Sequence, residues 1–261
     1  MPQPAQLDSE KRHRGLAIAA TEISLPQMLP VANARVPCRP ATPGRETSLV
    51  EQFIAAGSLV DRATEPPVVF TEPKLATGFP DVVAVYLSDK PITITPGRST
   101  LHEEHLRLLH HLCSVKTTSF EEIKNGLGWR GKMLQRCIAD LADADLVYVR
   151  GSKIVARNTG AIFAVRKIVA IEAKIGDWKR ALRQACSNTW FASHSYMLIP
   201  STRAIEQVEA AAKAVGIGVM VFDGNKTKTV VPPLVRSIPA SYGSWLFNEW
   251  TLRTIFSSAA K

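Results

Sequence analysis

The chain has 261 residues, of which 46% are hydrophobic, so it can bury a sizeable core in one or two domains. Its formal net charge of +9 favours a polyanionic partner such as nucleic acid over an acidic small molecule. No apolar run approaches the roughly 18 residues that span a bilayer, and the N-terminus lacks a signal-peptide core, so we expect no membrane partner and a cytoplasmic location. The four cysteines lie far apart without CxxC pairing, which predicts reduced thiols.

The N-terminal region predicts an arm followed by a short helix and two strands. Residues 1–45 are rich in proline and alanine with scattered arginines, which indicates an extended basic arm. A solvated tail is the favoured interpretation, and an arm that tracks phosphates is the alternative. Thr47 is a capping residue ahead of helical apolar spacing that ends at Gly57. Strands are then predicted over 68–71 and 80–87.

The pattern changes at about Thr100 to three helices and a hairpin. Leucine spacing predicts a helix over 101–113, and a capping box at Ser119 opens a second short helix. A third helix over 130–142 has a predicted core stripe of Met133, Leu134, Cys137, Ile138 and Leu141. A hairpin with a basic tip follows over 146–156. This arrangement resembles a winged helix.

This module offers a candidate surface for DNA. The third helix would enter a major groove while the hairpin tip reaches phosphates. The candidate nucleic-acid-binding residues of the module are Arg130, Lys132, Gln135, Arg136, Arg150 and Lys153. Acidic residues nearly balance the basic ones, so a protein-docking module is the alternative. Trp129 is either an aromatic contact or part of the core.

Alternating strands and helices resume beyond Thr159. The predicted elements are a strand over 167–174, a helix over 177–191, a strand over 196–199, a helix over 203–214 and a strand over 219–222. The tail over 232–261 is predicted to end in a packed helix carrying two tryptophans. The middle module therefore reads as an insertion into an α/β domain.

Charged residues at two strand ends indicate a chemical site. The apolar run 168–171 leads into Glu172 and Lys174, which lie two residues apart and so on one face of a strand. Burying both charges is costly unless a metal, a phosphate or each other compensates them. Asp81 supplies a second carboxylate at the head of another apolar run. The alternatives are an ion pair on a half-exposed edge strand for Glu172 and Lys174, and a simple turn cap for Asp81.

The order of these elements, with Pro80-Asp81, Glu172-Ala173-Lys174 and Gln184 in the following helix, resembles the PD-(D/E)xK nuclease superfamily. The resemblance covers residues 47–87 and 167–200. It implies an α/β restriction-endonuclease-like fold, with a mixed central sheet flanked by helices and interrupted by a winged helix-turn-helix module. The implied division is an arm over 1–45, the core over 46–99, the inserted module over 100–158, and the rest of the core with a C-terminal helix over 159–261.

The resemblance also implies a metal-dependent nuclease that hydrolyses phosphodiester bonds, most simply a DNA endonuclease. Asp81, Glu172 and the Ala173 carbonyl would bind Mg²⁺, with Mn²⁺ as an alternative, because hard cations prefer oxygen ligands. Lys174 would position or help to deprotonate the attacking water and stabilise developing charge. Glu51 would complete the metal shell directly or through water, with an ordinary surface glutamate as the alternative.

The helix that follows the motif has a polar face with predicted roles. At about 100° per residue Asp177, Arg180, Gln184 and Asn188 lie away from the apolar stripe. Gln184 would orient the substrate or Lys174, and Arg180 would contact nucleic acid.

Other functions stay open at this point. A non-catalytic DNA-binding regulator or assembly subunit would use the inserted module alone, and an RNA-processing nuclease on the same fold is not excluded. A homodimer, or protein partners that supply specificity, are further alternatives. His102 and His105 stand one helical turn apart, but the segment is not HExxH, so a solvated helix face is expected there rather than a metal site.

Overall fold

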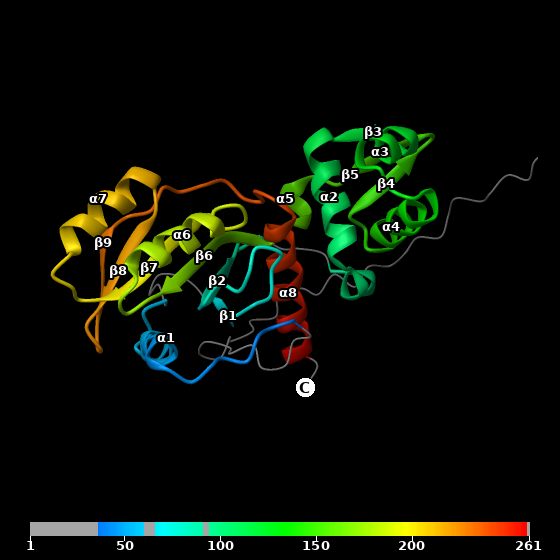
Figure 1. Ribbon diagram of the computed structural model, residues 1–261. Coiled ribbons are helices and arrows are strands. Elements are labelled where there is room, and N and C mark those ends of the chain that lie inside the picture. The colour runs from blue at the N-terminus through cyan, green and yellow to red at the C-terminus, as the bar shows by residue number, and fades with distance from the viewer. Residues whose placement is uncertain (1–35, 60–65, 91–93, 260–261) are drawn as a thin grey trace, which may run out of the picture.

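The computed structural model describes residues 36–59, 66–90 and 94–259 (Figure 1). The protein is mixed α/β, with a six-stranded central sheet flanked by helices and a separate three-stranded sheet. The predicted mixed central sheet is therefore confirmed. In the described part of the chain, no helix has the length and apolar character needed to cross a membrane.

The central sheet has the order β1-β2-β6-β7-β8-β9. Its strands are β1 Val68–Thr71, β2 Val82–Leu87, β6 Val165–Ala173, β7 His194–Pro200, β8 Gly218–Phe222 and β9 Thr227–Val231. Strands β6, β7 and β8 run parallel, and the other neighbouring pairs run antiparallel. The two central parallel strands read as apolar runs because both of their faces are covered. Strand β9 was not predicted, since exposed threonine and lysine interrupt its apolar pattern.

The pairing of β2 with β6 brings distant parts of the sequence together. Val82 stands opposite Ile171 in this antiparallel ladder. The same register carried one residue further sets Asp81 level with Glu172. The two strands are adjacent although the whole inserted segment separates them in sequence.

Helices cover both faces of the sheet (Figure 1). Helix α1, Arg45–Ala55, packs Leu49 and Phe53 onto one face, in an apolar cluster with residues of β2 and β6. The opposite face is covered by α6 Trp178–Asn188, α7 Ile205–Val215 and α8 Tyr242–Ala259. The predicted start of α1 is wrong, because the helix is capped at Gly44 and begins at Arg45. Thr47 lies inside the first turn, where its hydroxyl donates to the Thr42 carbonyl at 2.6 Å.

The segment between β2 and β6 forms a compact unit of its own. Its elements are η1 Pro96–Thr100, α2 Glu103–Val115, β3 Thr117–Ser119, α3 Phe120–Leu127, α4 Gly131–Asp143, β4 Val147–Arg150, β5 Lys153–Ala156 and α5 Thr159–Ile162. The three predicted helices and the hairpin are confirmed. The capping box is present, since Ser119 accepts from the Glu122 backbone and Glu122 Oε2 accepts from the Ser119 backbone at 2.7 Å. Strand β3, which joins β5, was not predicted.

The inserted segment is docked on the core rather than only tethered to it. Helix α2 packs on α8, and one apolar cluster runs through both parts. Arg98 of η1 and Glu249 of α8 form a buried ion pair with Nη2 and Oε1 2.6 Å apart, and their side chains are 3% and 1% exposed. A second nitrogen, Nε, lies 3.1 Å from Oε2. Removing either partner would leave a buried charge uncompensated.

Three expectations for the inserted segment are corrected or resolved. Met133, placed in the core stripe, is 41% exposed, whereas the other four members of the stripe are buried. His105 is not on a solvated face: it is buried and its Nε2 lies 2.9 Å from Asp140 Oδ2. Trp129 is partly buried against the core.

The predicted N-terminal arm lies outside the described residues over 1–35. Residues 36–44 are not a free arm, because Cys38 forms a β-bridge with Pro73 and Lys74 N donates to Pro37 O at 2.8 Å. This stretch runs beside the end of β1 and leads into α1.

Candidate active site

Asp81 contacts the Glu172-Ala173-Lys174 segment directly. Its Oδ2 accepts a hydrogen bond from the Ala173 backbone N–H at 2.7 Å and lies 3.7 Å from Lys174 Nζ. The recorded partner of this carboxylate is thus on another strand rather than in its own turn, which contradicts the turn-cap alternative. The long-range contact expected from the motif is present.

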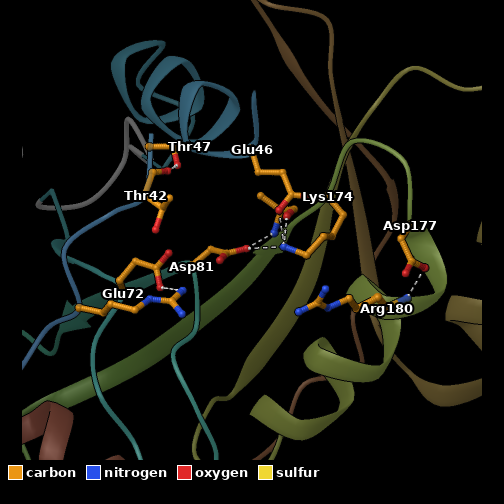
Figure 2. Close-up of polar contacts among 10 residues, drawn as sticks. Thr42, Glu46, Thr47, Glu72, Asp81, Lys174, Asp177 and Arg180 are labelled. Carbon is orange, nitrogen blue, oxygen red and sulfur yellow. Dashed lines mark hydrogen bonds and ion pairs between the residues drawn. The ribbon is translucent and has the colours of Figure 1, made fainter. Parts of the chain in front are cut away.

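The Lys174 ammonium lies among oxygen atoms at the end of β6. It donates to Glu46 Oε2 at 2.8 Å and to the Ala173 carbonyl at 2.9 Å, and Figure 2 shows Glu46 and Asp81 both directed at it. The residue is 8% exposed. The edge-strand alternative is wrong, because β6 lies between β2 and β7 and the acidic partners of Lys174 are Glu46 and Asp81.

Glu172 is almost completely buried, with 2% of its surface exposed. Asn188 of α6 donates from Nδ2 to Glu172 Oε1 at 2.7 Å, and Oε2 has no hydrogen-bond partner among the described residues. Burial, followed by the charge of Asp81, raises the pKa of Glu172 to about 8. Burial also raises the pKa of Asp81, although the Ala173 N–H and Lys174 oppose it.

A cavity of about 850 Å³ opens in front of this cluster. Helix α1, the turn before β2, the end of β6 and α6 contribute to its walls. The charged residues lining it are Arg39, Arg45, Glu46, Glu51, Glu72, Asp81, Lys174 and Arg180. Arg180 extends from α6 toward the same space as Asp81 and Lys174 (Figure 2). Glu172 is not among the lining residues and lies behind the cavity wall.

Glu51 and Gln184 both line the cavity but differ in their surroundings. Glu51 is exposed and lines the cavity, but among the described residues no contact to Asp81 or Lys174 is recorded for it. Glu46, at the start of the same helix, makes the contact instead. Gln184 lines the cavity, and its Oε1 is buried without a hydrogen-bond partner in the described part of the chain.

Three residues of this site were missed from sequence: Glu46, Glu72 and Asn188. Glu46 immediately precedes Thr47, so placing the helix cap three residues too late, at Thr47 instead of Gly44, excluded it. Asn188 was placed on the polar face of its helix without a role. Glu72 had no motif to mark it, although its main chain has φ of +50°, which is uncommon for a residue other than glycine.

The predicted nucleic-acid face of the inserted segment is exposed but partly neutralised. Arg130, which precedes α4, and the α4 residues Lys132, Gln135 and Arg136 are all exposed. Arg136 Nε lies 3.7 Å from Asp140 Oδ2, and Lys153 Nζ lies 3.8 Å from Glu122 Oε2. The Arg150 guanidinium stands 5.7 Å from the Tyr148 ring centroid. These weak surface pairs leave the basic groups able to exchange partners.

The donor atoms fit a hard cation in their chemistry. They are carboxylate and carbonyl oxygens, which such cations prefer. Glu172 Oε2 has no hydrogen-bond partner among the described residues, and the pKa values of Asp81 and Glu172 are raised, so added positive charge would stabilise both carboxylates. In this arrangement the Lys174 ammonium supplies the positive charge. Over the described residues, no three His, Cys, Asp or Glu side chains converge as a metal group, so two carboxylates and the Ala173 carbonyl are the donors offered.

Comparison of the chain with protein-family models, with curated proteins and with solved structures finds no match. The functional argument therefore depends on the geometry of the site.

Proposed function

We propose that this protein is a metal-dependent nuclease of the PD-(D/E)xK type that hydrolyses phosphodiester bonds, with DNA as its substrate. The observation that carries the proposal is that the Asp81 carboxylate contacts both the Ala173 N–H and the Lys174 ammonium beside a large cavity. Two apolar strands that are remote in sequence deliver an acid, a second acid and a lysine to one place. Burying charged groups costs free energy, so their convergence at one place supports a functional site rather than ordinary core packing.

Asp81, Glu172 and the Ala173 carbonyl are the groups that would hold Mg²⁺ or Mn²⁺. When bound, such a cation polarises phosphoryl oxygens and lowers the pKa of water. The chain's own contribution is charge and position. The Ala173 N–H fixes the Asp81 carboxylate, and Asn188 fixes one oxygen of Glu172.

Lys174 supplies a mobile positive charge in this proposal. Its ammonium is held by Glu46 and the Ala173 carbonyl, both within 2.9 Å. A phosphoryl group entering the cavity offers a stronger negative partner, so Lys174 is placed to stabilise charge on the reacting phosphate and to orient water. Glu46 holds the ammonium in place, and because an ammonium has three donors, Lys174 can keep this contact while it reaches the phosphate.

The inserted segment supports a nucleic-acid substrate. Three helices with a small antiparallel sheet, in the order β3-β5-β4, are consistent with a winged helix, and α4 presents its basic residues to solvent. In this proposal α4 contacts the major groove and the hairpin β4–β5 contacts phosphates. RNA as the substrate is a different outcome of the same assay.

One observation favours a second candidate, a non-catalytic nucleic-acid-binding subunit. Lys174 lies among Glu46, Ala173 and Asp81 oxygens, and an ammonium that stays there would keep a metal from them. The fold would then serve only to carry the basic surfaces. This candidate predicts binding without hydrolysis.

The test is a cleavage and binding panel on the full chain with duplex, single-stranded and branched DNA and with RNA, in Mg²⁺, Mn²⁺ or chelator. We expect metal-dependent cleavage that Asp81→Asn abolishes while binding persists. Asp89→Asn, at the exposed opposite end of β2, is the matched control and should cleave normally. Equal cleavage by Asp81→Asn, or no cleavage by the unmodified protein in any metal, would reject the nuclease.

A further inference from the structure

Part of the cavity wall is formed by Arg39 and Glu72, whose main chains are joined by a hydrogen bond. Arg39 N donates to Glu72 O at 3.0 Å, and the Arg39 guanidinium donates to Glu72 Oε2 at 2.5 Å. The neighbouring β-bridge between Cys38 and Pro73 holds the two segments together. The backbone at Arg39 is therefore fixed, and its long side chain is the part that can move.

The Arg39 guanidinium is only partly engaged. Its side chain is 50% exposed and lies 4.8 Å from the Phe79 ring centroid. Among the described residues, Nη2 is the one guanidinium nitrogen with a recorded hydrogen bond to Glu72. An aromatic face and a single-point ion pair orient the group, and its other nitrogens make no side-chain hydrogen bond within the described part of the chain.

Glu72 is held in an unfavourable state. Its backbone lies in the left-handed region at φ +50°, and its side chain is 16% exposed inside the cavity wall. Burial raises the pKa of Glu72, Arg39 opposes this, and the charge of Asp81 adds to it. Strain of this kind persists where surrounding contacts impose it and is concentrated at functional sites. The Glu72 N–H donates to Asp81 O at 3.2 Å, which ties this residue to the catalytic strand.

We propose that Arg39 is a phosphate-binding residue of the cavity and that Glu72 is its internal substitute for phosphate. A phosphate of an entering polynucleotide strand displaces the Glu72 carboxylate and binds the Arg39 guanidinium in its place. The exchange is favourable because Glu72 is bound through a single guanidinium nitrogen, whereas guanidinium and phosphate form two parallel hydrogen bonds. This inference rests on the proposed nucleic-acid substrate.

A polynucleotide fits the cavity better than free phosphate does. Arg45 and Arg180 line other walls of the same cavity, so successive phosphates of one strand would meet separate guanidinium groups. Among the described residues, no acidic partner is recorded for the side chain of Arg180. Free phosphate would engage one such group and bind weakly.

The test measures the affinity of the full chain for a fluorescent oligonucleotide in chelator, across a series of salt concentrations. Arg39→Gln should weaken binding about tenfold and reduce the salt slope by about 0.7–0.9, the value for one phosphate contact. Glu72→Gln should tighten binding up to about fivefold, because the competing carboxylate is gone. In the Arg39→Gln background the Glu72→Gln gain should shrink at least twofold. Inorganic phosphate should compete only at concentrations far above those of the oligonucleotide.

Glu209→Gln is the matched control. It removes an ion pair of 3.7 Å on the surface of α7, away from the cavity, and should change neither the affinity for the oligonucleotide nor the salt slope. If Arg39→Gln does not fold, Arg39→Lys should keep the salt slope and lose part of the affinity. A protein that cleaves nucleic acid while Arg39→Gln leaves the salt slope unchanged, or while Glu72→Gln weakens binding, overturns this inference alone. A protein that binds no nucleic acid overturns the proposed function as well.

Discussion

Replacing Glu172 by glutamine should change how the stability of the protein depends on pH. Glu172 is 2% exposed, and burial with the Asp81 charge raises its pKa to about 8. A carboxyl group with a raised folded pKa binds a proton more readily in the folded state than in the unfolded state. The unmodified protein should therefore lose stability as pH rises from about 4.5 to about 8. Glutamine retains the acceptor for Asn188 and carries no charge, so the variant should lack this loss.

The difference between about 8 and the ordinary value of 4.5 corresponds to about 5 kcal/mol of folding free energy at high pH. Hydration of the carboxylate reduces that figure, so at pH 9 we expect Glu172→Gln to be more stable than the unmodified protein by about 2–5 kcal/mol. At pH 5 the difference should fall below about 1 kcal/mol, because only the unfolded state is then partly ionised. The Asp81 charge contributes to this difference, because its repulsion of the Glu172 carboxylate is absent in the variant.

The assay is urea unfolding from pH 5 to pH 9 in chelator, so that bound cations do not contribute. Glu121→Gln is the matched control, because its side chain is 67% exposed and should give a curve parallel to that of the unmodified protein. If Glu172→Gln also gives a parallel curve, burial does not control the ionisation of this carboxyl, and the electrostatic argument for the site fails.

Two further substitutions test the site and the docking of the inserted segment. Glu46→Gln should lower the cleavage rate about 10-fold to 100-fold, because the charge-assisted hydrogen bond to Lys174 contributes about 1.5–3 kcal/mol. The control Glu51→Gln should change the rate less than twofold, and similar effects of the two substitutions would contradict the contact between Glu46 and Lys174. Arg98→Met should lower the free energy of unfolding in urea by about 3–5 kcal/mol, because it leaves Glu249 buried without a partner. The control Lys124→Met breaks an exposed ion pair and should lower it by less than about 1 kcal/mol, and equal losses would show that the buried pair is unimportant.

Much of the site followed from strand patterns, because apolar runs ending in Asp81 and in Glu172-Ala173-Lys174 indicate buried strands whose ends present charge. The change from strand patterns to leucine spacing near Thr100 likewise revealed the inserted segment. These signals are strong since burial on two faces constrains every residue of a strand.

Other features depended on contacts that no local pattern encodes. The start of α1 was misplaced because capping preferences favour Thr47, whereas the chain enters the helix at Gly44, which has no side chain to cap it. Glu46 was lost with that boundary. His105 could have been recognised as buried, since it follows Leu101 by four residues and precedes Leu109 by four, on one apolar stripe. Asn188 has its partner on another element, so its role needed the fold.

The adjacency of β2 and β6 has a consequence for synthesis of the chain. Strand β2 has residues of both faces buried in the folded protein, yet its partner Val165–Ala173 is translated only after the whole inserted segment. At about 5–20 residues per second, β2 is without that partner for several seconds. During this interval it is an exposed apolar edge open to pairing with another nascent chain. Early folding of the inserted segment would let β6 pair with β2 as soon as β6 is translated, because the folded segment holds the two strands on one side of it. Substitutions that slow its folding should therefore lower soluble yield more than they lower final stability.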